Sequence, residues 1–287
     1  MNFIEEYVKE INKGNIIVGK KVKKIYEKLL KEINDNSLPF YFDEEKGNRP
    51  IEFIETFCKQ AEGEIGKPIK LELFQKAYIQ ALFGFVYRDT GLRRFNETMF
   101  LVGRKNGKTT LLSAIALYMM IADGEGSAEC YSVATKKDQA SKAFKSACAM
   151  RAQSPEIRAI ISKRRTDMYM PSTFSSFEPL SSDSDTLDGL NSHLVIIDEL
   201  HAIKDRNLYE VMKQSTSSRR QPLVVMITTA GTVRECIFDD IYTYANNVLN
   251  GTVKNDSFLP VLYELDKTDE WKDIKCWQKA NPRTWNY

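Results

Sequence analysis

The chain of 287 residues has no apolar stretch long enough to cross a membrane. Its longest nearly apolar run, Leu111 to Ala122, has 12 residues and contains Ser113, whereas a spanning helix needs about 20. The first ten residues, MNFIEEYVKE, carry acids where a secretory signal carries a basic run and then an apolar one. We therefore expect no membrane partner and no export from the cytoplasm.

Cysteine and histidine are scarce. The five cysteines are widely spaced, odd in number and include no C-x-x-C pair, and there are only two histidines. These numbers argue against a disulfide framework and against a zinc site. We expect reduced, mostly buried thiols, and we interpret the histidines as structural rather than metal-binding. The residues concerned are Cys58, Cys130, Cys148, Cys236 and Cys276, with His193 and His201.

The chain also lacks an excess of charge of either sign. It has 41 basic and 39 acidic residues, a net charge of +2, which neither demands nor excludes a nucleic-acid partner. Any DNA contact must therefore come from a local patch. The densest basic cluster, for which both a DNA contact and an ordinary solvated face stay open, is Arg158, Lys163, Arg164 and Arg165.

No internal repeat and no Pro/Gly/Ser-rich linker interrupts the chain. Residues 1–40 place Ile, Leu and Val at helical spacing among Lys and Glu, which predicts amphipathic helices in an N-terminal accessory segment. Another helix, mostly buried, is predicted over Leu71–Tyr87. Ser172–Asp185 is Ser-rich and acidic, which favours an exposed strand or hairpin running into a loop.

After Thr98 short apolar runs alternate with longer helical ones. This alternation is typical of βαβ units around a parallel sheet. The expected strands are Met99–Val102, Tyr131–Ala134, Leu194–Ile197 and Leu223–Thr228, and the expected helices are Lys108–Ile121 and Asp138–Ala152.

A basic, glycine-containing loop, GRKNGKTT, runs from Gly103 to Thr110 between the first expected strand and its helix. Gly107 would let the backbone turn tightly around an anion, and the helix start would supply N–H groups and a partial positive charge. Lys108 would reach the β and γ phosphates, and the Thr109 hydroxyl would ligate Mg²⁺. The loop therefore predicts ATP and Mg²⁺ as cofactors.

The loop departs from the standard pattern G-x-x-x-x-G-K-[ST]. Gly103 stands one residue too close to Gly107, and Val102 occupies the expected glycine position. The sequence R-K-N-G-K also occurs in ordinary basic surface turns, so this alternative stays open. The preceding strand, the apolar helix and an acidic strand downstream nevertheless fit the context that a phosphate loop requires.

The acidic strand, LVIIDE from Leu194 to Glu199, ends in two carboxylates. Open α/β sheets bind ligands at this end of their strands. Asp198 would hold the magnesium and Glu199 would polarise the attacking water, although two such acids can also cap a helix. The next apolar run ends in TTAG, Thr228 to Gly231, a hydroxyl pair that could sense the γ-phosphate.

Five segments together resemble a known family, and they follow one another as FQKAYIQALFGF, GRKNGKTTL, LDGLNSHLVIIDELHA, RRQPLVVMITTAG and WQKANP. In this order the chain resembles the large terminase subunit of tailed bacteriophages and prophages, over roughly residues 50–282. The resemblance implies an α/β fold, a mostly parallel-sheet phosphate-loop NTPase of the additional-strand, catalytic-Glu type. It implies that R-K-N-G-K-T is the family's customary loop, and that the chain hydrolyses ATP to move double-stranded DNA into a procapsid.

The resemblance also implies roles for single residues. Gln75 would contact adenine, and Arg104 would face the γ-phosphate of its own site. An arginine finger from a neighbouring subunit is also implied, with Arg219 and Arg220 as candidates. The implied nucleotide-binding set is Gln75, Gly103, Arg104, Lys105, Asn106, Gly107, Lys108, Thr109 and Thr110. The implied catalytic set is Glu199, Lys108 and Arg104, the metal ligands are Thr109 and Asp198, and the coupling motif is Thr228, Thr229, Ala230 and Gly231.

The implied partners are double-stranded DNA, the capsid portal and the small terminase subunit, in the cytoplasm of a bacterial host. We expect a homo-oligomeric ring on the portal and a monomer alone. We divide the chain into an accessory segment (1–50), an ATPase core (51–250) and a C-terminal lid or linker (251–287). Family members continue into an RNase H-type domain, whereas this chain stops at Tyr287, so no nuclease activity is expected.

Two other functions stay open. A helicase-like or other nucleic-acid-dependent ATPase would need a second domain, for which 287 residues leave little room. A nucleotide-binding scaffold of a ring would need Lys108 and Asp198 but no base, and the presence of Glu199 argues against it.

Overall fold

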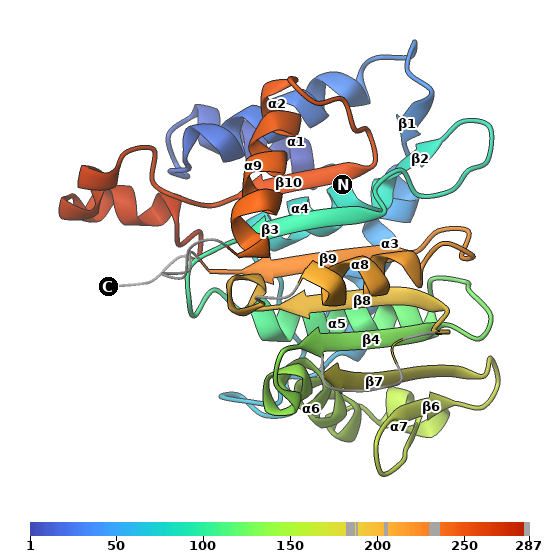
Figure 1. Ribbon diagram of the computed structural model, residues 1–287. Helices are drawn as coiled ribbons and strands as arrows, with labels where there is room; N and C mark the ends of the chain where they lie inside the picture. The colour runs from blue at the N-terminus through green and yellow to red at the C-terminus, as the bar shows by residue number, and fades with distance from the viewer. Residues whose placement is uncertain (182–186, 188, 204–205, 230–235, 284–287) are drawn as a thin grey trace.

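The computed structural model describes residues 1–181, 187, 189–203, 206–229 and 236–283. Within these residues the central strands are β3 (Glu97–Leu101), β4 (Glu129–Ala134), β5 (Ser162–Lys163), β6 (Met168–Met170), β7 (Ser175–Ser181), β8 (Ser192–Asp198), β9 (Leu223–Thr228) and β10 (Phe258–Leu262). They form one eight-stranded sheet in the order β10-β3-β9-β8-β4-β7-β6-β5 (Figure 1). All neighbouring pairs from β10 to β7 are parallel, and only β6 and β5 are antiparallel. The predicted mostly parallel α/β fold is confirmed.

The helices in the described residues are α1 (Phe3–Asn12), α2 (Lys20–Ile33), α3 (Glu44–Phe57), α4 (Leu73–Gly84), α5 (Lys108–Ile121), α6 (Lys137–Gln153), α7 (Pro155–Ile160), α8 (Arg206–Gln214) and α9 (Ile237–Asn250). Short 3₁₀ turns are η1 (Leu200–Ala202), η2 (Thr268–Lys272) and η3 (Ile274–Lys279). A second sheet pairs β1 (Phe40–Phe42) with β2 (Phe85–Tyr87). None of the helices in the described part of the chain is long and apolar enough to span a membrane.

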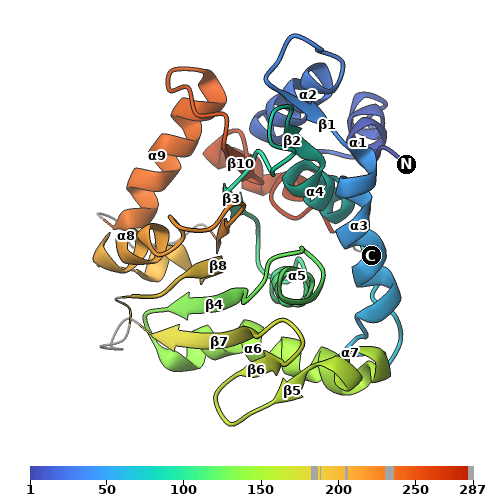
Figure 2. The same ribbon diagram turned by 90° about the vertical axis from the view of Figure 1, so that its right-hand side faces the viewer.

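Helices cover both faces of the sheet, with α5 on one side and α8 and α9 on the other (Figure 2). Strand β8 shows why both faces need a cover. Successive side chains of a strand point to opposite faces of the sheet. Leu194 and Ile196 belong to the core that includes α1 to α6, whereas Val195 and Ile197 pack with side chains of η1, α8 and α9. An uninterrupted apolar run such as this one is typical of a strand buried on both faces.

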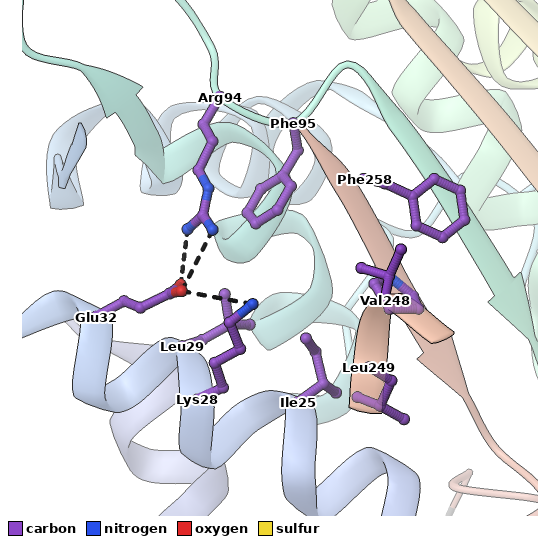
Figure 3. Close-up of a pocket in the computed structure, with 10 residues that line it drawn as sticks. Ile25, Lys28, Leu29, Glu32, Arg94, Phe95, Val248, Leu249 and Phe258 are labelled. Carbon is purple, nitrogen blue, oxygen red and sulfur yellow. Dashed lines mark hydrogen bonds and ion pairs between the residues drawn. The ribbon is translucent and has the colours of Figure 1, made fainter. Parts of the chain in front are cut away.

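The N-terminal helices are anchored to the sheet through Arg94. Its guanidinium, which is only 1% exposed, binds Glu32 of α2 at 2.7 and 3.3 Å (Figure 3). It also donates to the Asp256 carbonyl at 2.7 Å and lies 3.5 Å from the centre of the Phe40 ring. A small cavity beside this pair holds about 10 Å³, which is room for about one water molecule and not for a ligand.

Most predicted elements are confirmed, with ends shifted by a few residues. Helix Lys108–Ile121 and strand Leu223–Thr228 match to the residue. The helix predicted over Leu71–Tyr87 is wrong at its end, because Phe85–Tyr87 forms β2. Those three residues pair with Phe40–Phe42, a contact about 45 residues distant that local periodicity does not reveal.

The strand expected within Ser172–Asp185 is present as β7, but it is not an exposed edge strand. The β5–β6 hairpin pairs with its outer side, and Ser175 and Phe177 are completely buried. Part of the predicted loop, residues 182–185, lies outside the described residues. The boundary proposed at residue 50 falls inside α3, and β10, beyond residue 250, is a strand of the main sheet. The division into three parts stays a prediction.

Candidate nucleotide-binding site

Three neighbouring strands bring the predicted site together. Strand β9 lies between β3, which leads into the phosphate loop, and β8, which ends in Asp198. The register pairs Leu101 with Thr228 and Ile227 with Asp198. Because all three strands are parallel, the loop, the acids and the hydroxyl pair meet at one edge of the sheet, on the left in Figure 1. One strand inserted between the loop strand and the acidic strand is the additional-strand arrangement.

The phosphate loop contains two residues in the left-handed backbone region. Gly107 has φ 73° and precedes α5, and Lys105 has φ 64°. A non-glycine residue with positive φ costs free energy and persists where its surroundings hold it. The loop ends at the N-terminus of α5, whose first N–H groups have no partner within the helix. The local fold therefore has the features of the anion site that the sequence predicts, and that assignment stays a prediction.

Lys108 is the first residue of α5 and its side chain lies inside the loop. Its ammonium nitrogen is 3.5 Å from the Val102 carbonyl oxygen. Burial lowers the pKa of Lys108, while Glu199 and Asp198 raise it and oppose that shift. A half-buried ammonium facing two carboxylates suits a site whose ligand brings both negative phosphates and a divalent cation.

The two acids at the end of β8 have different surroundings. Asp198 is 7% exposed, and burial together with the neighbouring Glu199 raises its pKa, while Lys108 and Lys142 lower it. Glu199 adopts the left-handed conformation, φ 58° and ψ 48°. Its N–H donates to the Ile227 carbonyl at 3.0 Å. Backbone turning at Glu199 gives adjacent carboxylates separate positions, which fits one acid for a metal and one for water.

The remaining predicted residues of the loop differ in exposure. Arg104, Lys105 and Thr110 are exposed, and Thr109 is half-buried in the first turn of α5. Gln75 is buried at the start of α4, where its amide oxygen accepts from the Glu72 N–H at 3.0 Å.

Gln75 also reaches the phosphate loop. A Cβ added to Gly107 would lie 3.2 Å from the Gln75 amide nitrogen. The donor set fits ATP with Mg²⁺: a cation, backbone N–H groups, a hydroxyl and a carboxylate.

His201 links the acidic strand to the predicted coupling motif, although only a structural role was expected for it. Turn η1 folds it back, so that Nε2 lies 3.0 Å from Oε2 of Glu199 and Nδ1 lies 2.8 Å from Oγ1 of Thr228. Val102 of the loop donates its N–H to the Thr228 carbonyl at 3.2 Å. Thr229 is buried, and Ala230 and Gly231 lie outside the described residues. The one local signal for this role was that His201 lies two residues after Glu199.

The candidate finger residues lie at the opposite edge of the sheet. The Arg219 side chain is 7% exposed and binds Glu125 at 3.2 Å, the Ser127 carbonyl at 2.6 Å and the Asn191 carbonyl at 2.9 Å. Arg220 is exposed. Because Arg219 already binds two other loops of its own subunit, Arg220 is the freer candidate, and the finger assignment stays a prediction.

A basic hollow of about 790 Å³ lies between α6 and the β5–β6 turn. Lys137, Lys145, Lys163 and Arg165 line it, together with Glu178, whose pKa is raised by burial. Two members of the predicted basic cluster, Lys163 and Arg165, thus face the hollow. Arg164 instead pairs with Asp167, and Arg158 is exposed on α7.

Comparisons with known proteins agree with this geometry. Residues 73–247 match the family described as "Terminase large subunit, ATPase domain". The chain is 25% identical over 244 residues to the terminase large subunit of Enterobacteria phage HK97, covering 83% of this chain and 46% of that protein. It is 24% identical over 290 residues to the terminase large subunit of Lactococcus phage p2, covering 98% and 52%.

A solved structure shows the same fold. The crystal structure of the HK97 bacteriophage large terminase superposes with a TM-score of 0.71 at 23% identity, over 83% of this chain and 48% of that one. The chain thus spans about half the length of these relatives. With the family match covering more than half of the chain, and a loop, acidic strand and inserted strand in the required order, this protein belongs to the terminase large subunit ATPase domain family.

Proposed function

We propose that this chain hydrolyses ATP at the edge formed by β3, β9 and β8, and that the reaction drives double-stranded DNA into a procapsid. The observation that carries the proposal is the meeting of Lys108, Asp198 and Glu199 at that edge. The two carboxylates raise the pKa of Lys108, while Glu199 raises and Lys108 lowers the pKa of Asp198. The family and the relatives named as terminase large subunits support the DNA-packaging part.

Each side chain has one task in this proposal. The Lys108 ammonium binds the β and γ phosphates, and the Gly107 turn lets the backbone approach them. Thr109 and Asp198 hold Mg²⁺, which neutralises charge on the phosphates when it is bound. Glu199 accepts the proton of the attacking water. Arg104, exposed on the loop, faces the γ-phosphate, and Gln75 contacts the adenine.

The contacts of Thr228 support a coupling role. Its carbonyl binds the phosphate loop through Val102, and its hydroxyl lies beside His201, which contacts Glu199. Thr228 is therefore joined to both parts of the site. Loss of the γ-phosphate would alter these contacts and shift β9, which lies between the two parts.

The partners we propose are double-stranded DNA, the capsid portal and the small terminase subunit, in the cytoplasm of a bacterial host. We propose a ring on the portal and a monomer alone. The DNA-facing surface we propose is the basic hollow, because four cations and one carboxylate line it and DNA phosphates attract such a surface.

ATP turnover, measured with and without duplex DNA at several protein concentrations, tests the function. We expect slow hydrolysis by the dilute chain and a more than linear rise with concentration, since a site completed by a neighbour is incomplete in a monomer. Stimulation by single-stranded DNA alone would favour a helicase-like enzyme, and binding without turnover under all conditions would favour a scaffold. That the chain cuts no DNA stays a prediction, which plasmid incubation with Mg²⁺ or Mn²⁺ tests.

A further inference from the structure

Residues 280–283 lie directly against the phosphate loop, about 175 residues earlier in the chain. The Gly103 N–H donates to the Ala280 carbonyl at 2.9 Å. The Asn106 amide nitrogen donates to Oδ1 of Asn281 at 3.0 Å, and Oδ1 of Asn106 accepts from the Arg283 N–H at 3.1 Å. Three hydrogen bonds therefore join the loop to the C-terminal segment.

Asn106 is the centre of this contact. Its side chain is almost completely buried, and the amide nitrogen also lies 3.1 Å from the carbonyl oxygens of both Gly103 and Arg104, which share its two hydrogens with Asn281. Both ends of the amide are thus occupied by protein atoms. The side chain therefore supports the base of the loop. If Asn106 contacts the nucleotide as predicted, the contact is made by its backbone.

The contact explains why a glycine stands at position 103. A Cβ there would lie 2.2 Å from Oδ1 of Asn281 and 2.9 Å from the Ala280 carbonyl oxygen. Real Cβ atoms do not approach other atoms so closely, and both obstacles belong to the C-terminal segment. The glycine that departs from the standard loop pattern is therefore placed for close approach of residues 280 and 281.

The segment also reaches the other side of the loop. Nε of Arg283 lies 3.2 Å from a carboxylate oxygen of Glu72, the residue that caps α4. Glu72 and Gln75 form a capping box, and the Gln75 amide lies beside Gly107. The contacts therefore run from Gly103 through residues 281–283 and the start of α4 back to Gly107.

The segment is itself held in place. The Trp277 carbonyl accepts from the backbone and side-chain nitrogens of Asn281, at 3.0 and 3.1 Å. Lys279 binds Asp266 and Glu270, both at 2.8 Å. These contacts keep Asn281 in a fixed position beside the phosphate loop.

We propose that Asn281, acting through Asn106, is a positioning residue that keeps the phosphate loop in its nucleotide-binding shape. Docking of residues 280–283 and occupation of the loop by a nucleoside polyphosphate then favour each other, because coupling between two binding events is reciprocal. This inference rests on the proposed function. It adds the C-terminal segment as a part of the nucleotide site.

Amide hydrogen exchange of the whole chain, with and without Mg-ADP, tests the coupling. We expect Mg-ADP at ten times its Kd to slow exchange of the Asn281 and Arg283 amides by up to about tenfold, the limit for complete linkage. Asn281→Ala should lose this slowing and raise the Kd for ADP by about three- to tenfold, the usual effect of one hydrogen bond. Asn281→Asp keeps the acceptor for Asn106 and should keep the slowing.

A double-variant cycle separates positioning from a general loss of structure. If Asn281 acts through Asn106, then Asn106→Ala raises the ADP Kd similarly, and the double variant binds no more weakly than the weaker single one. The matched control is Asn34→Ala, which loses one exposed side-chain bond, to the Leu30 carbonyl, and should leave both readouts unchanged.

Several results would overturn the inference. They are unchanged or faster exchange at residues 281 and 283 with Mg-ADP, wild-type ADP affinity in Asn281→Ala, or additive effects in the cycle. Lys108→Ala shows which proposal fails. If it binds ADP like the wild type, the nucleotide site itself is wrong. If it loses ADP binding while Asn281→Ala behaves as wild type, only the positioning role is wrong.

Discussion

Nε2 of His201 lies 3.0 Å from Oε2 of Glu199, and the other ring nitrogen lies 2.8 Å from Oγ1 of Thr228. Nε2 carries a proton in this contact, because a carboxylate oxygen only accepts hydrogen bonds. The imidazole therefore fixes the direction of the proposed base. It also ties that base to the strand between the loop and the acids.

Replacing His201 tests this contact. We expect His201→Ala to lower kcat by about 10- to 100-fold, the usual effect of a misplaced catalytic group, with little change in ADP affinity. Steady-state ATPase assays and calorimetric titration measure the two quantities. His201→Gln, which retains an N–H donor, should lose less activity. Equal kcat in all three proteins would contradict the positioning of Glu199 by His201.

Substitutions of the two acids at the end of β8 should impair different steps, turnover for Glu199 and magnesium binding for Asp198. Glu199→Gln should keep nucleotide affinity and lower turnover by about 10²- to 10⁴-fold, because the amide cannot accept the proton of water. Asp198→Asn should instead raise the Mg²⁺ concentration needed for nucleotide binding. Titrations of ADP at several Mg²⁺ concentrations separate the two defects. Wild-type hydrolysis by both variants would show that the acids only cap the following turn.

The finger candidates differ in their structural role. Arg219→Ala should lower the free energy of unfolding by about 2–4 kcal/mol, because its partner Glu125 and several carbonyls lose a buried cation. Arg220→Ala should leave stability unchanged. Denaturant unfolding curves measure both.

Mixing experiments then test the finger itself. Lys108→Ala subunits keep Arg220, so adding them to Arg220→Ala subunits should restore turnover if Arg220 acts on a neighbour. An arginine supplied from another subunit is worth about 10³–10⁵ in rate. Absence of rescue at any ratio, with both variants folded and associating, would point to Arg104 acting within its own site.

A pH-dependent contribution to stability comes from Asp123, far from the phosphate loop. Burial alone would raise its pKa, but Arg93, at 3.0 Å, and His193, at 2.8 Å, lower it below the ordinary value of 3.8. A lowered folded-state pKa stabilises the protein above the unfolded pKa, and this contribution is lost as pH falls through the folded value.

Asp123→Asn should therefore lower the free energy of unfolding by about 3–5 kcal/mol at pH 7, since it leaves the buried Arg93 guanidinium without its carboxylate. The difference from wild type should shrink as the pH falls below about 4. Unfolding by urea at pH 7 and at pH 3 measures it. A difference independent of pH would mean that Asp123 acts through packing rather than charge.

The local sequence was sufficient to predict an element where the residues of that element determine its structure. The apolar run of β9 and the helix after the phosphate loop were predicted to the residue, because period and flanking glycine are local signals. Lys108, Asp198 and Glu199 were expected to lie together because a parallel sheet brings the ends of its strands to one edge. They do lie together, and their roles stay predictions.

Contacts between distant segments were not predictable in this way. Phe85–Tyr87 became a strand only because Phe40–Phe42 pairs with it. The packing of Asn281 against Gly103 depends on where the chain returns after β10. Neither an asparagine nor a glycine in the sequence predicts such a contact. His201 had a local signal, its place two residues after Glu199, but its contact with Thr228 depends on β9 being the adjacent strand.

Helix α5 is buried along nearly its whole length, from Leu111 to Met120. Its amides can therefore exchange with solvent only when the entire domain unfolds. Lys108, the proposed phosphate-binding lysine, is the first residue of this helix and is therefore attached to a buried element. A preparation that loses nucleotide binding while these amides stay protected has therefore changed locally, at the phosphate loop or at residues 280–283. Exchange of the α5 amides thus separates a local defect from global unfolding.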